Sequence, residues 1–309
     1  MDRINQATKQ SIKEFLGIDV DSELLNPIHD YVFKRLFTAD EKRSKLALMD
    51  LLNSILELES ENPIEDLTVV NPEIPVDTLE SKKSRFDIRV KFKNGEQAIV
   101  EMQLSDKGDF KKRSQYIISK AYSSQEIAGR NYKALKKCYL ICITNFAVLK
   151  SKTEFVNDYR YRDREGNDLT ADETIIFLEL PKIEKIINKP IEKMTNLEMW
   201  TLFFRYVTDE SKREILNSII SRKDGINMAA MILYEISGDE QERIRYENAL
   251  IAELDHNSDI YAAEERGEYN KSFQIAKNAL LKGSTIEFVS EITGLAIEEI
   301  KQVQQEILV

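Results

Sequence analysis

Apolar residues in the first third of the chain change from helical to strand spacing. In "NPIHDYVFKRLF" (26–37), Ile28, Val32 and Leu36 recur once per turn, and "SKLALMDLLNSIL" repeats the pattern, so both segments predict helices. "DLTVVNPEIP" predicts a short strand whose prolines confine it to the edge or end of a sheet. The next segment, "RFDIRVKFKNGEQAIVEMQ" (85–103), predicts a β-hairpin with Asn94-Gly95 near its turn.

The pattern after the hairpin predicts a crossover and then a helical region. "FKKRSQYIISKAYSSQEIAGRNY" predicts a helix of about five turns, and "KKCYLICITNF" and "TIIFLELPKI" predict buried strands. From about residue 196 the spacing is helical almost throughout. An antiparallel hairpin followed by a helix and further strands predicts an α/β fold, with a mixed sheet flanked by helices and a helical C-terminal region.

A loss of periodicity around "EKIINKPIEKMTN" predicts a domain boundary near residues 184–196. We therefore expect an N-terminal extension over 1–25, an α/β domain over 26–190 and a helical region over 196–309. No apolar run approaches the roughly 20 residues of a membrane helix, and the first residues lack the apolar stretch of a signal peptide. We expect a cytoplasmic protein that does not associate with membranes.

Burial restricts the register of the predicted hairpin. A two-residue Asn94-Gly95 turn would place the apolar residues of the first strand on the same face as Glu101 and Gln103. A three-residue loop over 94–96 removes this conflict and gives one continuous apolar face. The predicted pairs on that face are Phe86 with Leu104, Ile88 with Met102, Val90 with Val100, and Phe92 with Ala98.

The opposite face of the hairpin carries the polar residues. In the predicted register Asp87 lies opposite Gln103 and Arg89 lies opposite Glu101, which leaves Asp87 and Glu101 as diagonal neighbours about 5–8 Å apart at Cβ. Two carboxylates this close repel each other unless a proton or cation intervenes, and oxygen ligands suit Mg²⁺ or Mn²⁺. A cross-strand salt bridge between Arg89 and Glu101 is the alternative interpretation, and geometry alone leaves both open.

Charge is distributed unevenly along the chain, whose net charge is −10 over 309 residues. Residues 107–150 contain ten Lys or Arg and two acids, whereas residues 231–309 contain sixteen acids and seven Lys or Arg. Because charge acts locally, a basic segment directly after the hairpin is compatible with nucleic-acid binding despite the negative total. The acidic C-terminal region predicts a different role.

Five motifs in a fixed order carry a family resemblance. "HDYVFKRLF", "FDIRV", "IVEMQ", "DFKKRSQYIISKAY" and "YLICITNF" resemble the Rpn family of recombination-promoting nucleases, a transposase-like group within the PD-(D/E)XK nuclease superfamily. The resemblance covers roughly residues 26–150 and, more loosely, the C-terminal "IAKNALLKGSTIEFVSEITGLAIEEI". It implies a restriction-endonuclease-like core and an endonuclease that hydrolyses DNA with Mg²⁺ or Mn²⁺.

The resemblance also assigns roles to the polar hairpin residues. Asp87 and Glu101 match the metal-binding acids, and the backbone carbonyl of Met102 is a further candidate ligand. Gln103 occupies the position of the family's catalytic lysine, which helps to position or deprotonate the attacking water. A neutral amide can orient water but supplies no charge. Either the metal ion alone activates the water, or a lysine from elsewhere, with Lys120 as the candidate, reaches the site.

Further positions are candidates for accessory roles. Asp30 matches a family position on the first helix, as an outer metal ligand or as a first-turn acid that only favours the helix dipole. Lys111, Lys112 and Arg113 follow the hairpin and are candidates for contacts to DNA phosphates, which give affinity without sequence choice.

The C-terminal "KGSTIEFVSEITGLAIEEIKQV" resembles a helix-turn-helix, but its acids outnumber its bases and disfavour DNA reading. We expect it to mediate self-association or to bind a protein partner.

Two alternatives to an active nuclease stay open. One is a catalytically inactive nuclease-fold protein that acts as a DNA-associated or regulatory binding module. The other is a defence component whose acidic tail shields the basic segment until a partner binds. The sequence does not distinguish DNA from RNA or duplex from single strand.

Overall fold

A computed structural model describes residues 24–39, 42–57, 63–70, 86–106, 108–125 and 131–308. The chain forms two compact units, of which the first ends at Tyr246 and the second begins at Glu247. The first unit contains the sheet. Most of the predicted N-terminal extension lies outside the described residues. No helix in the described part of the chain is long and apolar enough to cross a membrane.

Among the described residues, the sheet of the first unit has six strands in the order β1-β2-β3-β4-β6-β5. The strands are β1 (Leu67–Val69), β2 (Ile88–Phe92), β3 (Gln97–Gln103), β4 (Cys138–Thr144), β5 (Val156–Tyr159) and β6 (Glu173–Glu179). β3, β4 and β6 are parallel, whereas β1, β2 and β5 pair with their neighbours in antiparallel fashion. The mixed sheet predicted from the sequence is confirmed. β5 was not predicted, because "VNDY" has one buried residue and no apolar alternation.

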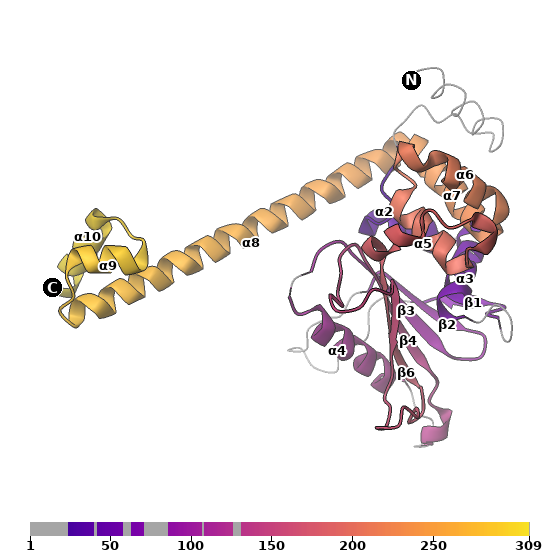
Figure 1. Cartoon of the computed structure of the whole chain (residues 1–309), viewed down its shortest axis with the longest axis horizontal. Coiled ribbons are helices and arrows are strands. Elements are labelled where there is room, and N and C mark those ends of the chain that lie inside the picture. Colours follow the sequence, from indigo (N-terminus) through magenta and orange to yellow (C-terminus); the bar gives the residue numbers. More distant parts are fainter. Residues whose placement is uncertain are drawn as a thin grey trace. The chain divides into compact units, whose positions relative to one another are not determined.

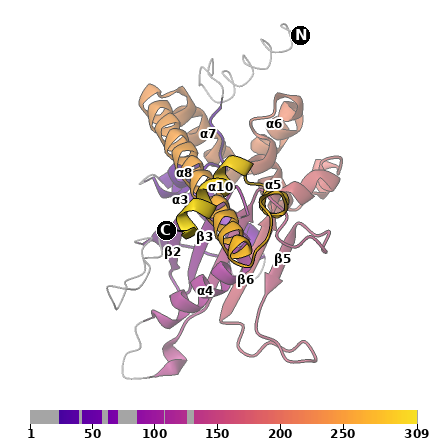
Figure 2. The same ribbon diagram turned by 90° about the vertical axis from the view of Figure 1, so that its left-hand side faces the viewer.

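Helices cover both faces of this sheet, and Figures 1 and 2 show α4 on the side away from the other helices of the first unit. The α-helices of this unit are α2 (Asp30–Thr38), α3 (Lys42–Leu56), α4 (Phe110–Ser123), α5 (Asn196–Tyr206), α6 (Arg213–Arg222) and α7 (Asp224–Gly238). Short 3₁₀ helices are η2 (Tyr132–Ala134), η3 (Leu180–Ile186), η4 (Ile191–Lys193) and η5 (Glu210–Lys212).

Alternate residues of β3 point into two separate hydrophobic cores. Val100 belongs to the larger core, which also contains Trp200 and the buried residues of α2, α3 and α5–α7. Ile99 belongs to the smaller core, with Phe110 of α4 and Phe177 of β6. Because β3 is covered on both faces, consecutive residues over 98–100 are apolar and buried, and no apolar-polar alternation is seen there. The boundary predicted near residue 190 therefore lies inside the first unit, since helices after it complete the larger core.

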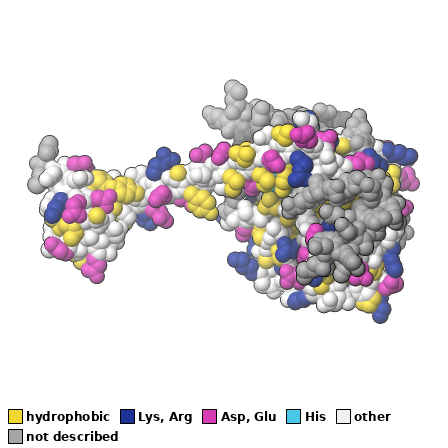
Figure 3. Space-filling view, turned by 90° about the horizontal axis from the view of Figure 1, so that it is seen from above, with side chains coloured by type: hydrophobic (Ala, Val, Ile, Leu, Met, Phe, Trp, Pro, Cys, Tyr) yellow, Lys and Arg dark blue, Asp and Glu magenta, His cyan; other side chains and the backbone are white. Residues whose placement is uncertain are grey.

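The second unit is helical. It contains most of α8 (Glu240–Leu281), followed by α9 (Ile286–Thr293) and α10 (Ile297–Leu308). Its small core includes Ala276, Val289 and Ile300. The turn between α9 and α10 is closed by Gly294 at φ 71°, a left-handed conformation that favours glycine. Figure 3 shows hydrophobic, basic and acidic side chains interspersed along α8.

The hairpin has the predicted faces for most of its length but not the predicted register. Ile88 pairs with Val100 and Val90 pairs with Ala98, a shift of two residues from the expected partners. The three-residue loop is 93–95 instead of 94–96, and Gly95 has φ 89°. In such loops a type I turn is followed by one left-handed residue, so Gly95 must stand last. The burial pattern determined only which residues share a face, and the glycine selected the register.

This correction changes the partners of the polar residues. Arg89 lies opposite Ile99, not Glu101, and its guanidinium donates to Gln97 Oε1 at 3.0 Å. The same register, continued by one residue, brings Asp87 opposite Glu101. Phe86, predicted on the larger core's face, packs in the smaller core, because the chain bends at Asp87 before β2 begins.

α3 and α7 approach closely in the larger core at Gly225. A Cβ atom at Gly225 would lie 2.4 Å from side-chain atoms of Asp50, whose Oδ2 accepts a 2.7 Å hydrogen bond from Trp200 Nε1. Gly225→Ala should therefore lower the free energy of unfolding by about 1–3 kcal/mol, measured by denaturant titration. Gly238→Ala, in the same helix with open space at its Cβ, is the matched control. Equal stabilities of the two variants would contradict this packing.

Candidate active site

Polar side chains from four elements meet at the carboxyl end of β3. Asp87 stands at the bend before β2, and Glu101 and Gln103 are on β3 itself. α2 packs against β2 and β3 from the larger-core side, and α4 begins shortly after β3 on the other side. The central strand of the sheet thus brings these residues between two helices.

Asp87 is held by the backbone of β3 and by α2. Its Oδ2 accepts a 2.7 Å hydrogen bond from the backbone N–H of Met102. Its Oδ1 lies 3.2 Å from Lys34 Nζ, and the Asp87 side chain is only 12% exposed. Lys34 Nζ also lies 2.6 Å from Oδ1 of Asp30, one turn earlier on α2. One ammonium group therefore bridges two carboxylates.

Glu101 is the most buried member of the group, with a side chain 3% exposed. Its Oε2 accepts from Arg113 Nη2 at 3.3 Å and lies 3.5 Å from Gln103 Nε2. Its Oε1 is buried and has no hydrogen-bond partner among the described residues. An unsatisfied carboxylate oxygen in a protein interior is costly, so a further ligand at this position is expected to stabilise the site.

Burial and mutual repulsion disfavour the charged forms of both acids. Burial raises the pKa of Asp87 to about 7, with the neighbouring Asp30 acting in the same direction. Burial raises the pKa of Glu101 to about 8, and the charge of Asp87 adds to the effect. Burial lowers the pKa of Lys34, but the charges of Asp87 and Asp30 outweigh it, so the net pKa is raised and Lys34 is cationic at neutral pH.

The residues present fit a hard divalent cation. Among the described residues no group of three or more His, Cys, Asp or Glu side chains is arranged to hold a metal ion. Mg²⁺, however, is commonly held by one or two carboxylates together with water and phosphate oxygens. Asp87 and Glu101 provide two carboxylates, one of them with an unpartnered buried oxygen. The N–H of Met102 points to Asp87, and in a β-strand the carbonyl of the same residue points to the same side.

The structure brings together Asp87, Glu101, Gln103, Met102 and Arg113, and it places Asp30 beside Asp87 through Lys34. The alternative salt bridge between Arg89 and Glu101 is wrong, because Arg113 occupies that role.

Lys111 and Lys112 are exposed in the first turn of α4, near Arg113. Lys120 lies about two turns beyond Arg113, with its ammonium 5.8 Å from the centroid of the Tyr116 ring.

Lys34 is the charged residue that sequence reasoning missed. It lies in "HDYVFKRLF", four residues after Asp30, so the two share one face of α2. That spacing is a weak signal, because pairs of this kind are frequent on exposed helix surfaces. Only the packing of α2 against the hairpin shows that this pair faces Asp87.

A mixed sheet covered by helices on both faces, with two acids at the carboxyl end of its central strand, defines a restriction-endonuclease-like fold. A family model described as "PD-(D/E)XK nuclease family transposase" matches residues 27–263, so the chain belongs to this family. Membership supports a nuclease or transposase-like role and implies DNA as the substrate. Nucleases of this superfamily typically use divalent metal ions. Neither the curated proteins nor the solved structures gave a match.

Removal of one buried charge should stabilise the metal-free protein at high pH. A carboxyl group with a raised folded-state pKa contributes most stability below its ordinary pKa, and this contribution is lost as the pH rises. For Glu101 this contribution is lost between pH 4.5 and about pH 8, which are the ordinary and the raised pKa. Glu101→Gln and Asp87→Asn should therefore unfold about 4 °C or more above the wild type at pH 8 in chelator, with little difference at pH 4.

The same thermal-unfolding experiment with Mg²⁺ tests the cation site. Mg²⁺ should raise the Tm of the wild type more at pH 8 than at pH 6, because protons compete for the same carboxylates. It should have little effect on the two site variants. Glu65→Gln, which removes an exposed carboxylate 73% accessible to solvent, should behave as the wild type. An equal Mg²⁺ effect on wild type and Glu101→Gln would exclude this site.

Proposed function

We propose that this protein is a metal-dependent endonuclease of the Rpn type, which hydrolyses phosphodiester bonds in DNA with Mg²⁺ or Mn²⁺. The observation that carries the proposal is the buried, unpartnered Oε1 of Glu101 beside a second, largely buried acid, Asp87. Purely structural carboxylates are normally satisfied by hydrogen bonds. A pair with raised pKa values in the family's metal-binding positions is explained better by a cation that is part of the working site.

The metal ligands would be Asp87, Glu101 and the Met102 carbonyl, as the resemblance to the family suggests. A divalent ion, when bound, acts as a Lewis acid that lowers the pKa of water and offsets phosphate charge. Gln103, two residues after Glu101 on the same face, has an amide that can both donate to and accept from a water molecule. We assign it the orientation of the attacking water, without a role as a base.

Lys34 would supply the positive charge that the family's lysine supplies elsewhere. Its ammonium is 3.2 Å from Asp87 and is cationic at neutral pH, so it acts as a fixed charge and not as a general base. Asp30 and Asp87 hold it beside the proposed cation site, where it would lie near the substrate phosphate. Lys120 has the weaker geometry, since its ammonium lies over Tyr116, further along α4.

The start of α4 would bind the DNA backbone. Lys111, Lys112 and Arg113 are exposed in its first turn, where the helix dipole also favours anions. Arg113 reaches from solvent to the buried Glu101, with 41% of its side chain exposed. We propose that a phosphate draws Arg113 away from Glu101, so that the released carboxylate oxygen becomes available to the cation.

The rival function is a nuclease-fold protein without activity that binds DNA or regulates another protein. The specific observation in its favour is that Lys34 and Arg113 already pair with the two acids. A third proposal is inhibition by the acidic tail. The acidic region begins at Met231, but buried residues of α7 after Met231 belong to the larger core, so we restrict the inhibitory tail to residues from Glu247 onward. We also propose a cytoplasmic location, compatible with the two free buried cysteines, and a partner-binding or self-association role for the second unit.

Cleavage of supercoiled plasmid tests the nuclease proposal. The purified full-length chain should nick plasmid with Mg²⁺ or Mn²⁺ and not with chelator. Asp87→Asn and Glu101→Gln should each lose at least about a hundredfold in rate, because each removes a charge that holds the cation. Glu65→Gln is the control for a lost carboxylate. No cleavage under any condition would favour the rival, and cleavage that survives both substitutions would refute the site.

Kinetics of lysine variants test the role given to Lys34. Lys34→Met should lower kcat by about 10–100-fold with little change in KM, because the charge acts on the transition state. Lys34→Arg should retain part of the activity, since it keeps the charge. Lys120→Met tests the other lysine. A larger kcat loss in Lys120→Met than in Lys34→Met would reverse the assignment, and thermal unfolding of each variant checks that the fold is intact.

A further inference from the structure

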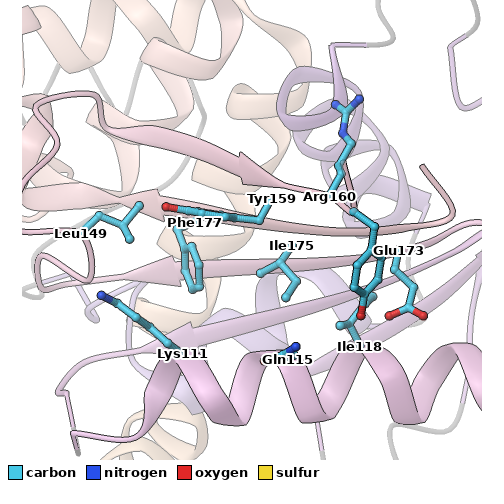
Figure 4. A pocket seen from close by; sticks show the side chains of 10 residues that line it. Lys111, Gln115, Ile118, Leu149, Tyr159, Arg160, Glu173, Ile175 and Phe177 are labelled. Atoms are coloured by element: carbon cyan, nitrogen blue, oxygen red, sulfur yellow. The ribbon is translucent and has the colours of Figure 1, made fainter. Parts of the chain in front are cut away.

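A cavity of about 480 Å³ lies between α4 and the strands β5 and β6, on the smaller-core face of the sheet (Figure 4). Its apolar lining includes Ile118 of α4 and Ile175 and Phe177 of β6. The Tyr159 ring stands at the edge of this lining, 40% exposed and 5.9 Å from the Phe177 ring. The cavity therefore offers flat aromatic and aliphatic surfaces to a ligand.

Polar groups are placed at intervals along this cavity. Figure 4 shows Lys111 at one end, Gln115 pointing in from the middle of α4, and Glu173 at the other end. Glu173 accepts a hydrogen bond from Ser119 Oγ at 3.4 Å, which orients its carboxylate. Lys152 adds a second cation, with its Nζ 5.2 Å from the centroid of the Tyr159 ring. Arg160 also lines the cavity, with its guanidinium held by Asp158 and Asp168. Lys111 thus marks a cationic end of the cavity, and Glu173 places a carboxylate at the other end.

The cationic end lies close to the candidate active site. Lys111 and Arg113 are in the same turn of α4, but Arg113 reaches Glu101 on β3 whereas Lys111 lines the cavity beside β6. In the sheet only β4 separates β3 from β6, so the two locations are about 10 Å apart. A nucleic-acid strand held at the carboxylates can therefore reach the cavity with an adjacent nucleotide.

We propose that this cavity binds one unpaired nucleobase of the substrate strand, next to the phosphate at the active site. The proposal rests on the proposed nuclease function. The base stacks on the ring of Tyr159 and meets the ring of Phe177 edge to face, since the two rings lie at 73° to each other. Its phosphate lies at Lys111, and its edge meets Gln115 and Glu173. A carboxylate accepts hydrogen bonds from the exocyclic amino group of adenine, cytosine or guanine. Thymine has no amino group and offers only its ring N3–H, so we expect it to bind less tightly.

The chemistry of the cavity favours this occupant over an apolar one. An aliphatic ligand would cover polar atoms of Glu173 and Gln115 without giving them a hydrogen bond, beyond the one that Glu173 already accepts from Ser119. A nucleotide matches both ends, with an anion for Lys111 and hydrogen-bond donors for Glu173. A base that is paired in a duplex presents neither a free face nor a free Watson–Crick edge, so the base must be unpaired or flipped out of its stack. A free nucleotide shares this chemistry and is distinguished by the experiment.

Fluorescence of 2-aminopurine, an adenine analogue with an exocyclic amino group, tests the cavity. The full-length protein is titrated in chelator into single-stranded 12-mers that carry 2-aminopurine at successive positions. Stacking on Tyr159 should quench the probe strongly at one position only.

Anisotropy with the same oligonucleotides should show binding at least about tenfold weaker for Gln115→Trp, whose indole fills the cavity. Tyr116→Trp, an exposed position of the same helix outside the cavity, is the control and should bind as the wild type.

The outcomes separate this proposal from the nuclease proposal. Because chelator stops hydrolysis, binding is measured whether or not the protein cleaves DNA. If the protein nicks plasmid but shows no position-specific quenching, the cavity proposal alone is overturned. The same holds if Gln115→Trp binds the oligonucleotides as tightly as the wild type. Position-specific quenching without cleavage under any metal overturns the nuclease proposal and retains the cavity. If dAMP or dCMP alone binds as tightly as the oligonucleotide, the cavity is a site for free nucleotides and not for a base of the substrate strand, and the proposal is overturned. Weaker binding by Glu173→Gln of amino-bearing bases, with a smaller loss for thymine, supports the assigned edge.

Discussion

The burial of two carboxylates at the carboxyl end of β3 is the constraint on which the rest of the site depends. Water is excluded from Glu101 and largely from Asp87, so their charges must be removed by protonation or balanced by groups of the protein or by a bound cation. Two helices that pack on opposite faces of the sheet supply partial compensation. Lys34 comes from α2 and Arg113 from α4, and each pairs with one acid. The two-sided covering of the sheet is thus what makes such a site possible.

The hairpin determines where these two acids meet. Glu101 is fixed by β3, whose backbone is hydrogen-bonded on both sides, but Asp87 depends on the register of β2. That register follows from the loop 93–95 and the left-handed Gly95, at the opposite end of the hairpin. In the register expected from burial alone, Asp87 would lie opposite Gln103, and Arg89 would neutralise Glu101. One glycine therefore separates a site with an unpartnered carboxylate oxygen from a closed cross-strand ion pair.

The sequence predicted the fold class, most strands and the acids, because apolar periodicity and motif order are local properties. It failed where a feature depends on packing between distant segments. The break in periodicity before residue 196 resembled a domain boundary, yet α5–α7 return to the larger core. Lys34 could not be assigned because nothing along the chain shows that α2 contacts the hairpin. The position of the hairpin loop is predictable from the sequence, however, since the preference for glycine at the last position of a three-residue loop distinguishes 93–95 from 94–96.

The charge balance of the site gives a physical reason for glutamine at position 103. Asp30, Asp87 and Glu101 carry three negative charges when ionised, and Lys34 and Arg113 carry two positive charges, so the group lacks one positive charge. A lysine at position 103 would neutralise the group and compete with a divalent cation for the carboxylate of Glu101. With glutamine, a divalent cation brings the total to one positive charge, which is complementary to a phosphodiester. In the proposed site, the positive charge near a phosphate would then come from Lys34 of α2 on the side of Asp87, while Arg113 of α4 lies on the side of Glu101.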